Sequence, residues 1–187
     1  KAKPGYVVIE VKACGLCHSD VGALEDPGWM NIIKYTPIII GHEFSGVITE
    51  VGEGVEGYKV GDRVAVCPMQ PDADGPGYGR DGGYATYSTA PVEYLIPIPD
   101  EVDFVQAAAA TDAGMTSYHA VVGQGGVKEG TKVGIIGIGG LGTLGNQFAV
   151  LKGAKVYVAS RKASAREKAL QAGAYKAAES ILDFQDE

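Results

Sequence analysis

Seven consecutive residues, Cys14–Asp20 with the sequence CGLCHSD, combine two thiols, an imidazole, a hydroxyl and a carboxylate. Thiolate, imidazole and carboxylate are the side chains that bind zinc. The C-x-x-C spacing is also typical of redox-active cysteine pairs. Nothing else in the sequence supports a zinc knuckle or a redox pair. We therefore expect Cys17 alone to act as a ligand, with its partners far along the chain, and Cys14 to be the last inward residue of a strand.

His42 is the second candidate ligand, in the segment GHEFSG, where Glu43 follows it. The chain has only two other histidines, His18 and His119. A single histidine beside a glutamate is more often structural than a metal ligand. The metal hypothesis gains weight because Cys17 and a glycine-rich loop typical of dinucleotide-binding proteins occur in the same chain.

That loop has the sequence GIGGLG and supplies Gly137, Gly139 and Gly142 in the spacing G-x-G-x-x-G, with Gly140 between them. It follows a predicted strand and begins a predicted helix, which is the context that the motif requires. The first glycine allows a tight turn, the second lets a pyrophosphate approach, and the third lets helix and strand pack closely. The alternative is a purely structural glycine-rich turn.

The end of the following strand indicates which dinucleotide binds. An acidic residue there would bind the ribose 2′-hydroxyl of NAD. This chain has Ser160, Arg161 and Lys162 instead, and no carboxylate before Glu167. A hydroxyl and two cations suit a 2′-phosphate, so the sequence favours NADP(H) over NAD(H). Alternatively, the two cations simply form the solvated beginning of a helix.

Composition excludes several classes of protein. The 187 residues carry a formal net charge of -7, which argues against binding to a nucleic-acid backbone. No apolar run reaches the ~20 residues needed to cross a membrane, and the beginning resembles no signal peptide. Three cysteines are too few for a disulfide framework, and reduced thiols favour a cytoplasmic location.

Patterns of apolar residues divide the chain near Asp112. Residues 1–112 are β-rich with one short helix, and residues 113–187 alternate strand and helix as in a parallel βαβ unit. The first part is expected to contain strands at 6–13, 44–51, 62–66, 84–90 and 93–98, and helices at 21–24 (capped by Ser19-Asp20) and 104–110. The second is expected to contain helices at 115–122, 141–152 and 165–172 and strands at 132–137 and 155–159.

Five segments, in order, resemble landmarks of the zinc-dependent alcohol dehydrogenases of the medium-chain dehydrogenase/reductase family. They are VKACGLCHSD, GHEFSGVITEVGEGV, VGDRVAV, DAGMTSYHAV and GIGGLG. The resemblance implies a β-rich GroES-like catalytic domain at 1–112 and an α/β Rossmann domain from 113. From Lys132 onward the sequence provides two strands and two helices, whereas a complete domain of this type has about six parallel strands. Residues 113–187 are therefore expected to form its N-terminal half.

The resemblance also implies a catalytic zinc. Its first two ligands fall on Cys17 and His42, and an acidic residue beside the metal falls on Glu43. The third ligand, commonly cysteine, falls on Asp112, which is a competent zinc ligand. A carboxylate in place of a thiolate should make the zinc a slightly stronger Lewis acid.

Further positions carry over from the same family. Ser19 falls where a hydroxyl bonds to the substrate oxygen, and Asp20 where a carboxylate orients the histidine ligand. His18 matches a residue facing the cofactor pyrophosphate, and Thr116 one near the nicotinamide. Many members carry a proton-relay histidine where this chain has Gly22, so the relay is expected to end at the cofactor ribose or at water.

A second, structural zinc is not expected. Many members bind it with four clustered cysteines after the strand that ends in VAV. Here only Cys67 is present, followed by the cysteine-free segment PMQPDADGPGYGRDGG. Cys67 is expected to be a small half-buried residue.

The implied activity is the interconversion of alcohols and aldehydes or ketones by hydride transfer, in a homo-oligomer (dimer or tetramer) that binds a small-molecule substrate. Polyol or sugar dehydrogenases of the family also use an acidic third ligand and are an alternative. Two others remain open: a catalytically degenerate zinc- or dinucleotide-binding module, and a zinc-free quinone reductase. Trp29, Met30 and Tyr35 could line a pocket or serve only as packing.

Overall fold

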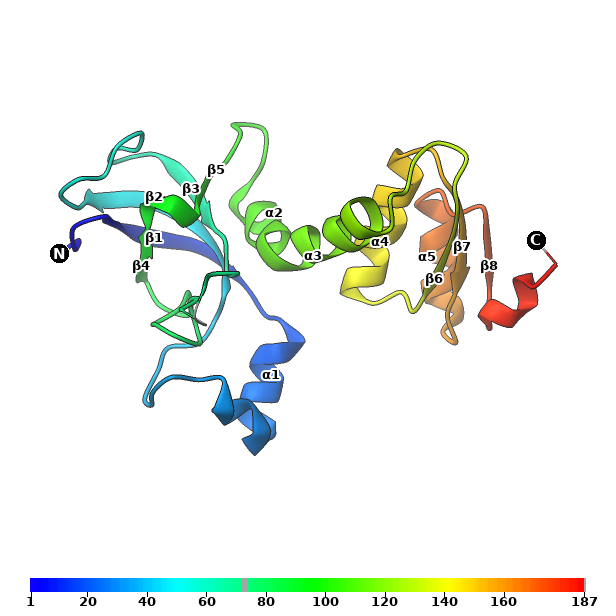
Figure 1. Cartoon of the computed structure of the whole chain (residues 1–187), viewed down its shortest axis with the longest axis horizontal. Helices are drawn as coiled ribbons and strands as arrows, with labels where there is room; N and C mark the ends of the chain where they lie inside the picture. The colour runs from blue at the N-terminus through cyan, green and yellow to red at the C-terminus, as the bar shows by residue number, and fades with distance from the viewer. Residues whose placement is uncertain (72–73, 187) are drawn as a thin grey trace. The chain divides into compact units, whose positions relative to one another are not determined.

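A computed structural model describes residues 1–71 and 74–186 of the chain. The chain divides into two compact units, Lys1–Asp112 and Ala113–Glu187. Figure 1 colours the first unit from blue to green and the second from green to red. Each unit has a sheet of its own.

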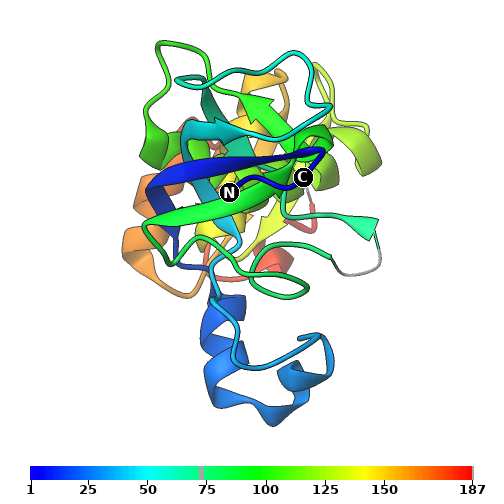
Figure 2. The same ribbon diagram turned by 90° about the vertical axis from the view of Figure 1, so that its left-hand side faces the viewer.

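The sheet of the first unit has the order β4-β1-β2-β3-β5, and every neighbouring pair is antiparallel. Figure 2 shows β1 and β4 side by side at the front of this unit. Its strands are β1 (Tyr6–Gly15), β2 (Glu43–Val51), β3 (Arg63–Val66), β4 (Tyr87–Pro91) and β5 (Leu95–Pro97). The β-rich character predicted for this part of the chain is confirmed.

Alternate residues of these strands build the core of the first unit. Val7 and Ile9 on β1, and Phe44 and Ile48 on β2, are fully buried together with Val64 on β3. Period-two alternation places such residues on one face of a sheet. The core therefore anchors β1 and β2, and Cys17 and His42 lie just beyond the ends of these strands.

The first helix differs from the prediction. Helix α1 spans His18–Glu25, so it begins three residues earlier than expected, and its N-cap is Cys17 rather than Ser19-Asp20. The carboxylate of Asp20, at the third helical position, accepts a hydrogen bond from the backbone nitrogen of Cys17 at 3.0 Å. Asp20 therefore does take part in capping, as the sequence indicated. It does so from inside the helix, where its carboxylate binds the backbone of the N-cap residue Cys17.

The rest of the first unit consists of short helices and a loop. Helix α2 (Phe104–Ala109) packs on β1 and β2, and its N-cap Asp103 accepts a bond from the backbone of Gln106. Residues 74–83, between β3 and β4, form a loop. Two short 3-10 helices lie in the described part of the unit, η1 (Pro27–Asn31) before β2 and η3 (Val92–Tyr94) after β4.

The second unit contains a three-stranded parallel sheet of order β6-β7-β8. Its strands are β6 (Lys132–Ile136), β7 (Lys155–Ala159) and β8 (Lys176–Ala178). The expectation of two strands was wrong, because the sheet has a third strand, β8. This strand was not predicted because it is only three residues long and lacks a β-branched residue. The parallel topology confirms the partial Rossmann fold.

Helices of the second unit follow the predicted alternation. They are α3 (Met115–Tyr118), η5 (His119–Gln124), α4 (Gly140–Leu151), α5 (Ala163–Gln171) and η6 (Ile181–Phe184). The segments η5 and η4 (Ala110–Gly114) are π-helical, a rare form that is frequent at functional sites. The boundary between the units falls inside η4.

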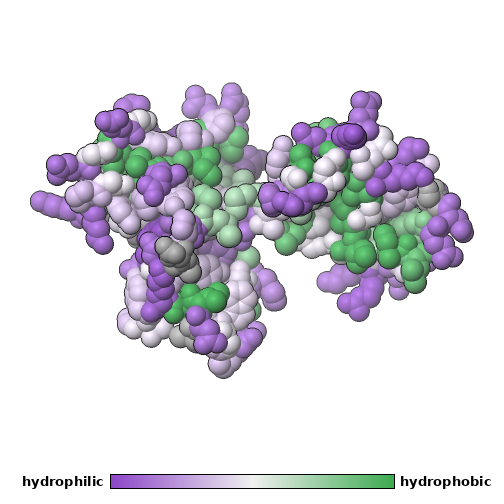
Figure 3. Space-filling model, viewed as in Figure 1, coloured by the Kyte–Doolittle hydropathy of each residue, from purple (hydrophilic) through white to green (hydrophobic). Residues whose placement is uncertain are grey.

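Hydrophobic side chains also reach the surface of the second unit, where Figure 3 shows them gathered on one face. Ile136, Leu151 and Leu182 are each more than two-thirds exposed. Across the described residues, none of the helices combines the length and the apolar character required to cross a membrane.

Candidate metal centre and nucleotide loop

Four potential metal ligands converge in the first unit. One ligand atom from each of Cys17, His42, Glu43 and Asp112 lies within 4.8 Å of the others. His42 and Glu43 are buried, while Cys17 and Asp112 are half-buried. The structure thus brings together the three predicted zinc ligands and the predicted neighbouring carboxylate.

Different elements supply these side chains. Cys17 is the N-cap of α1, His42 directly precedes β2, and Glu43 is the first residue of β2. Asp112 lies in the π-helical segment η4, in the continuation of α2. Because α2 packs on β1 and β2, the sheet that carries His42 and Glu43 also fixes the segment leading to Asp112.

The distances between the ligand atoms suit a tetrahedral zinc ion. Nε2 of His42 lies 3.2 Å from Oδ2 of Asp112, and Sγ of Cys17 lies 3.8 Å from the same oxygen. Zinc bonds of ~2.0–2.3 Å at tetrahedral angles separate neighbouring ligand atoms by ~3.3–3.8 Å. Residues 17, 42 and 112 therefore fit zinc in donor type and in spacing.

The imidazole of His42 is held from both sides. Nδ1 lies 3.3 Å from Oδ1 of Asp20, which leaves Nε2 for Asp112 or a metal. Burial alone would lower the pKa of His42, but the carboxylates of Asp112 and Asp20 outweigh it and raise the pKa to about 10. Metal binding at Nε2 would displace a proton from this ring.

Asp20 is buried and has three partners. Its Oδ2 accepts bonds from the backbone nitrogen of Cys17 and from the hydroxyl of Tyr84, each at 3.0 Å. Burial would raise the pKa of Asp20, but contact with His42 and these hydrogen bonds lower it below the usual value. A charged carboxylate therefore faces Nδ1, as is common behind metal-bound histidines.

Ser19 stands beside the sulfur of Cys17. Its hydroxyl lies 3.0 Å from Sγ and also forms a hydrogen bond with Tyr78. The Tyr78 ring packs against the imidazole of His42, with ring centroids 5.2 Å apart. Burial raises the pKa of Tyr78, so its phenol stays protonated at neutral pH.

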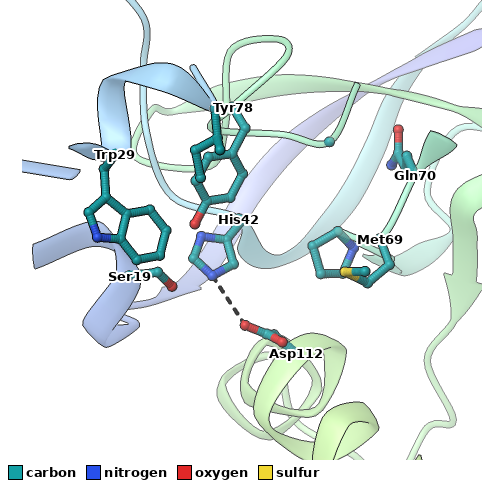
Figure 4. A pocket seen from close by; sticks show the side chains of 10 residues that line it. Ser19, Trp29, His42, Met69, Gln70, Tyr78 and Asp112 are labelled. Atoms are coloured by element: carbon teal, nitrogen blue, oxygen red, sulfur yellow. Dashed lines mark hydrogen bonds and ion pairs between the residues drawn. The ribbon is translucent and has the colours of Figure 1, made fainter. Parts of the chain in front are cut away.

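A cavity of about 360 Å³ opens beside these groups. Ser19, His42 and Asp112 line one part of it, and Trp29 and Met69 line other parts (Figure 4). All of its lining residues belong to the first unit. A volume of this size suits a small molecule.

The three residues Trp29, Met30 and Tyr35, which could have lined a pocket, have different outcomes. Trp29 lines the cavity, and Tyr35 is exposed outside it. The side chain of Met30 lies outside the described part of the chain.

Several residues around the site were not predicted from the sequence, among them Met69, Gln70, Tyr78 and Tyr84. The first three line the cavity, and Tyr84 binds Asp20. All four come from the segment between β3 and β4, whose Pro and Gly content predicts irregular backbone but not its path. The available signal was the presence of a polar residue, Gln70, and two aromatic residues, Tyr78 and Tyr84, in a glycine-rich segment.

The glycine loop has the geometry that its spacing requires. Gly137 adopts φ +89°, which other residues rarely adopt, and a side chain at Gly142 would overlap the carbonyl oxygen of Gly137. Apart from the adjacent residues and the backbone of α4 itself, no described atom lies within 4 Å of where a side chain at Gly139 or Gly140 would begin. The loop is thus open on the side of its second glycine and closely packed at its third.

Other predicted cofactor residues lie at the surface of their own units. His18, at the beginning of α1, and Thr116, in α3, are exposed. After β7, Ser160 is half-buried, and Arg161 and Lys162 are exposed.

A further cation, Arg166, was not predicted. Its Nη1 donates to the carbonyl oxygens of Ser160 at 2.6 Å and Arg161 at 3.1 Å, which fixes the segment after β7.

The other two cysteines play different parts. Cys14 belongs to β1 and packs against the core, and burial raises the pKa of its thiol to about 12. Cys67 is half-buried, as expected, with Sγ 3.7 Å from the carbonyl oxygen of Met69.

Comparison with known proteins places this geometry in a family. The family model for the alcohol dehydrogenase GroES-like domain matches residues 3–100. An alcohol dehydrogenase of Geobacillus stearothermophilus is 39% identical over 194 residues, covering 93% of this chain and 56% of the relative. The chain thus spans about half the length of the curated relatives it matches.

Solved structures of the same family are similar to this chain in fold. Acetophenone reductase from Geotrichum candidum in complex with NAD is 32% identical with a TM-score of 0.84, covering 97% of this chain and 57% of that one. A cobalt- and zinc-bound alcohol dehydrogenase from Pyrobaculum aerophilum is 28% identical with a TM-score of 0.83, covering 95% and 58%. The chain belongs to the alcohol dehydrogenase family of medium-chain dehydrogenases/reductases, and its first unit carries the family's GroES-like domain.

Proposed function

We propose that the protein is a zinc-dependent oxidoreductase that interconverts small alcohols and aldehydes or ketones with a nicotinamide dinucleotide. The observation that carries the proposal is the convergence of Cys17, His42 and Asp112 with the spacing of a tetrahedral zinc site. Glu43 adds a carboxylate beside it. The cavity next to these ligands supplies room for a small substrate.

In this proposal, each residue of the site has a separate role. Cys17, His42 and Asp112 would hold one zinc, and Asp20 fixes the ring of His42. When bound, zinc supplies Lewis-acid stabilisation of the substrate oxygen, and nicotinamide supplies the hydride chemistry. Ser19 accepts the proton of the substrate hydroxyl while its own proton passes on, to water or to the cofactor ribose.

Residues 113–187 form, in this proposal, the N-terminal half of a Rossmann dinucleotide-binding domain. The open backbone at Gly139 and Gly140 supports binding of a pyrophosphate at the beginning of α4. His18 and Thr116 are assigned to the pyrophosphate and to the nicotinamide. The dinucleotide is NADP(H) rather than NAD(H), because Ser160, with the exposed Arg161 and Lys162, suits a 2′-phosphate.

Metal analysis combined with a matched pair of variants tests the proposal. We expect the purified protein to hold one zinc per chain, because the described cysteines provide no second cluster. Cys17→Ser should lose the zinc and the turnover of simple alcohols with NADP⁺. Cys67→Ser should keep both. Full turnover by metal-free Cys17→Ser protein would refute the zinc mechanism.

A further inference from the structure

Trp29 occupies the space that a side chain on α1 would otherwise fill. A Cβ atom added to Gly22 would lie 2.6 Å from Nε1 and 2.8 Å from Cε2 of the Trp29 indole. Real Cβ atoms essentially never approach other heavy atoms this closely, so the indole rests directly on the helix backbone. The indole of Trp29 can therefore take this position only because Gly22 has no side chain.

The short helix η1 holds the indole in place. Asp26 caps η1, since its Oδ1 accepts a bond from the backbone of Gly28 at 2.8 Å. The carbonyl oxygen of Asp26 accepts a second bond from the backbone of Trp29 at 3.0 Å. With the helix of Gly22 behind it, the indole forms a fixed wall of the cavity (Figure 4).

Ser19, His42, Tyr78 and Asp112 form one polar side of the cavity. Its other walls include Trp29, Ile32, Pro68 and Met69. Gln70 also lines it, but both ends of its amide are engaged within the loop. Oε1 accepts from Arg80 at 2.5 Å, and Nε2 donates to the carbonyl oxygen of Cys67 at 2.8 Å.

We propose that Trp29, seated against Gly22, makes this cavity selective for alcohols and carbonyl compounds with an apolar substituent, aromatic or alkyl, over polyols and sugars. This inference rests on the proposed function, because it takes the cavity as the substrate site. The indole and its apolar neighbours would cover such a substituent. Each additional hydroxyl of a polyol would lose its water without gaining a partner, which weakens binding by about tenfold.

Trp29 is the only tryptophan of the chain, so its fluorescence reports on this wall alone. We would titrate the zinc-loaded protein with benzyl alcohol and, separately, with sorbitol at the same concentrations. Benzyl alcohol should change the emission in a saturable manner and bind at least about tenfold more tightly than sorbitol. An equal or stronger response to sorbitol would overturn the inference.

Variants test the seat of the indole. Gly22→Ala should displace Trp29, shift its emission maximum and weaken benzyl alcohol binding by about tenfold or more. Leu24→Ala, on an exposed residue of the same helix, should change neither. Unchanged emission and affinity in folded Gly22→Ala protein would contradict the inference.

If Gly22→Ala does not fold, Trp29→Ala with binding measured by calorimetry takes its place. It should narrow the preference for benzyl alcohol over sorbitol, and an unchanged preference would overturn the inference. These experiments measure binding and not turnover. The proposed catalytic function and the proposed selectivity of the cavity can therefore be refuted independently. Benzyl alcohol binding without catalysis would refute only the proposed function. Zinc-dependent oxidation of sorbitol in preference to benzyl alcohol would refute only the selectivity.

Discussion

Nε2 of His42 lies 3.2 Å from Oδ2 of Asp112, although the two residues are 70 positions apart in the sequence. This pair and Cys17, rather than the two neighbouring cysteines of CGLCHSD, form the proposed metal centre. The third proposed ligand is the carboxylate of Asp112, and this assignment can be tested directly.

Asp112→Asn should lower zinc affinity by at least about tenfold, because a neutral amide replaces a charged oxygen ligand. Asp112→Cys should retain zinc, because a thiolate is an equally competent ligand. The measurement is competition for zinc against a chromophoric chelator. Wild-type affinity in Asp112→Asn would remove Asp112 from the ligand set.

Zinc should protect one cysteine from alkylation. Iodoacetamide should modify Cys17 rapidly in the metal-free protein and at least about tenfold more slowly after zinc is added, since the metal occupies the thiolate. Cys14 is the internal control. Its thiol, with a pKa of about 12, should react slowly in both cases. Peptide mass spectrometry gives both rates, and a Cys17 rate that does not respond to zinc would argue against coordination.

Tyr84→Phe should lower the free energy of unfolding by about 0.5–1.5 kcal/mol, because the hydrogen bond to Asp20 is lost. It should also lower zinc affinity, because Asp20 would hold His42 less firmly. Urea denaturation and zinc competition measure the two effects. Tyr87→Phe, an exposed residue on β4, is the matched control and should leave zinc affinity unchanged.

Gly142→Ala should destabilise the second unit by roughly 1–3 kcal/mol, because its methyl group would overlap the carbonyl oxygen of Gly137. Gly140→Ala should be tolerated, because the space around Gly140 is open. Thermal denaturation of the two variants compares them. Equal stability would mean that the packing between the loop and α4 is looser than the structure indicates.

Arg161→Ala should weaken binding of 2′,5′-ADP by about tenfold or more while changing the affinity for 5′-AMP little. The reason is that its cation is assigned to the 2′-phosphate. Lys168→Ala, in the last turn of α5, should affect neither ligand. Calorimetry measures each affinity, and equal losses for both nucleotides would refute the NADP assignment.

Local pattern predicted much of the fold. The strand at 155–159 matches β7 residue for residue, since Val156, Tyr157 and Val158 favour strands and a polar turn follows. Strand β8 was not predicted, because its three residues, Lys-Ala-Ala, show no alternation of apolar and polar residues that is long enough to indicate a strand. The π-helical form of η4 also escaped, since α and π helices share the same apolar spacing to within a residue.

The metal site shows where sequence reasoning ends. Cys17 and His42 are recognisable by residue type, but Asp112 looks like any other aspartate in a helix, and only a family resemblance singles it out. Tyr84 and Gln70 depend on the path of a loop whose backbone follows no period. Their roles arise from tertiary contacts at 3.0 Å or less, which propensity does not encode.

Asp20 joins two of the proposed ligands through one carboxylate. Oδ2 fixes the backbone of Cys17 at the beginning of α1, and Oδ1 faces Nδ1 of His42. Ordering of the first helical turn and orientation of the imidazole are therefore a single cooperative event. A substitution at Asp20 cannot tune one without disturbing the other, so we expect helix fraying and loss of metal to appear together along any unfolding path.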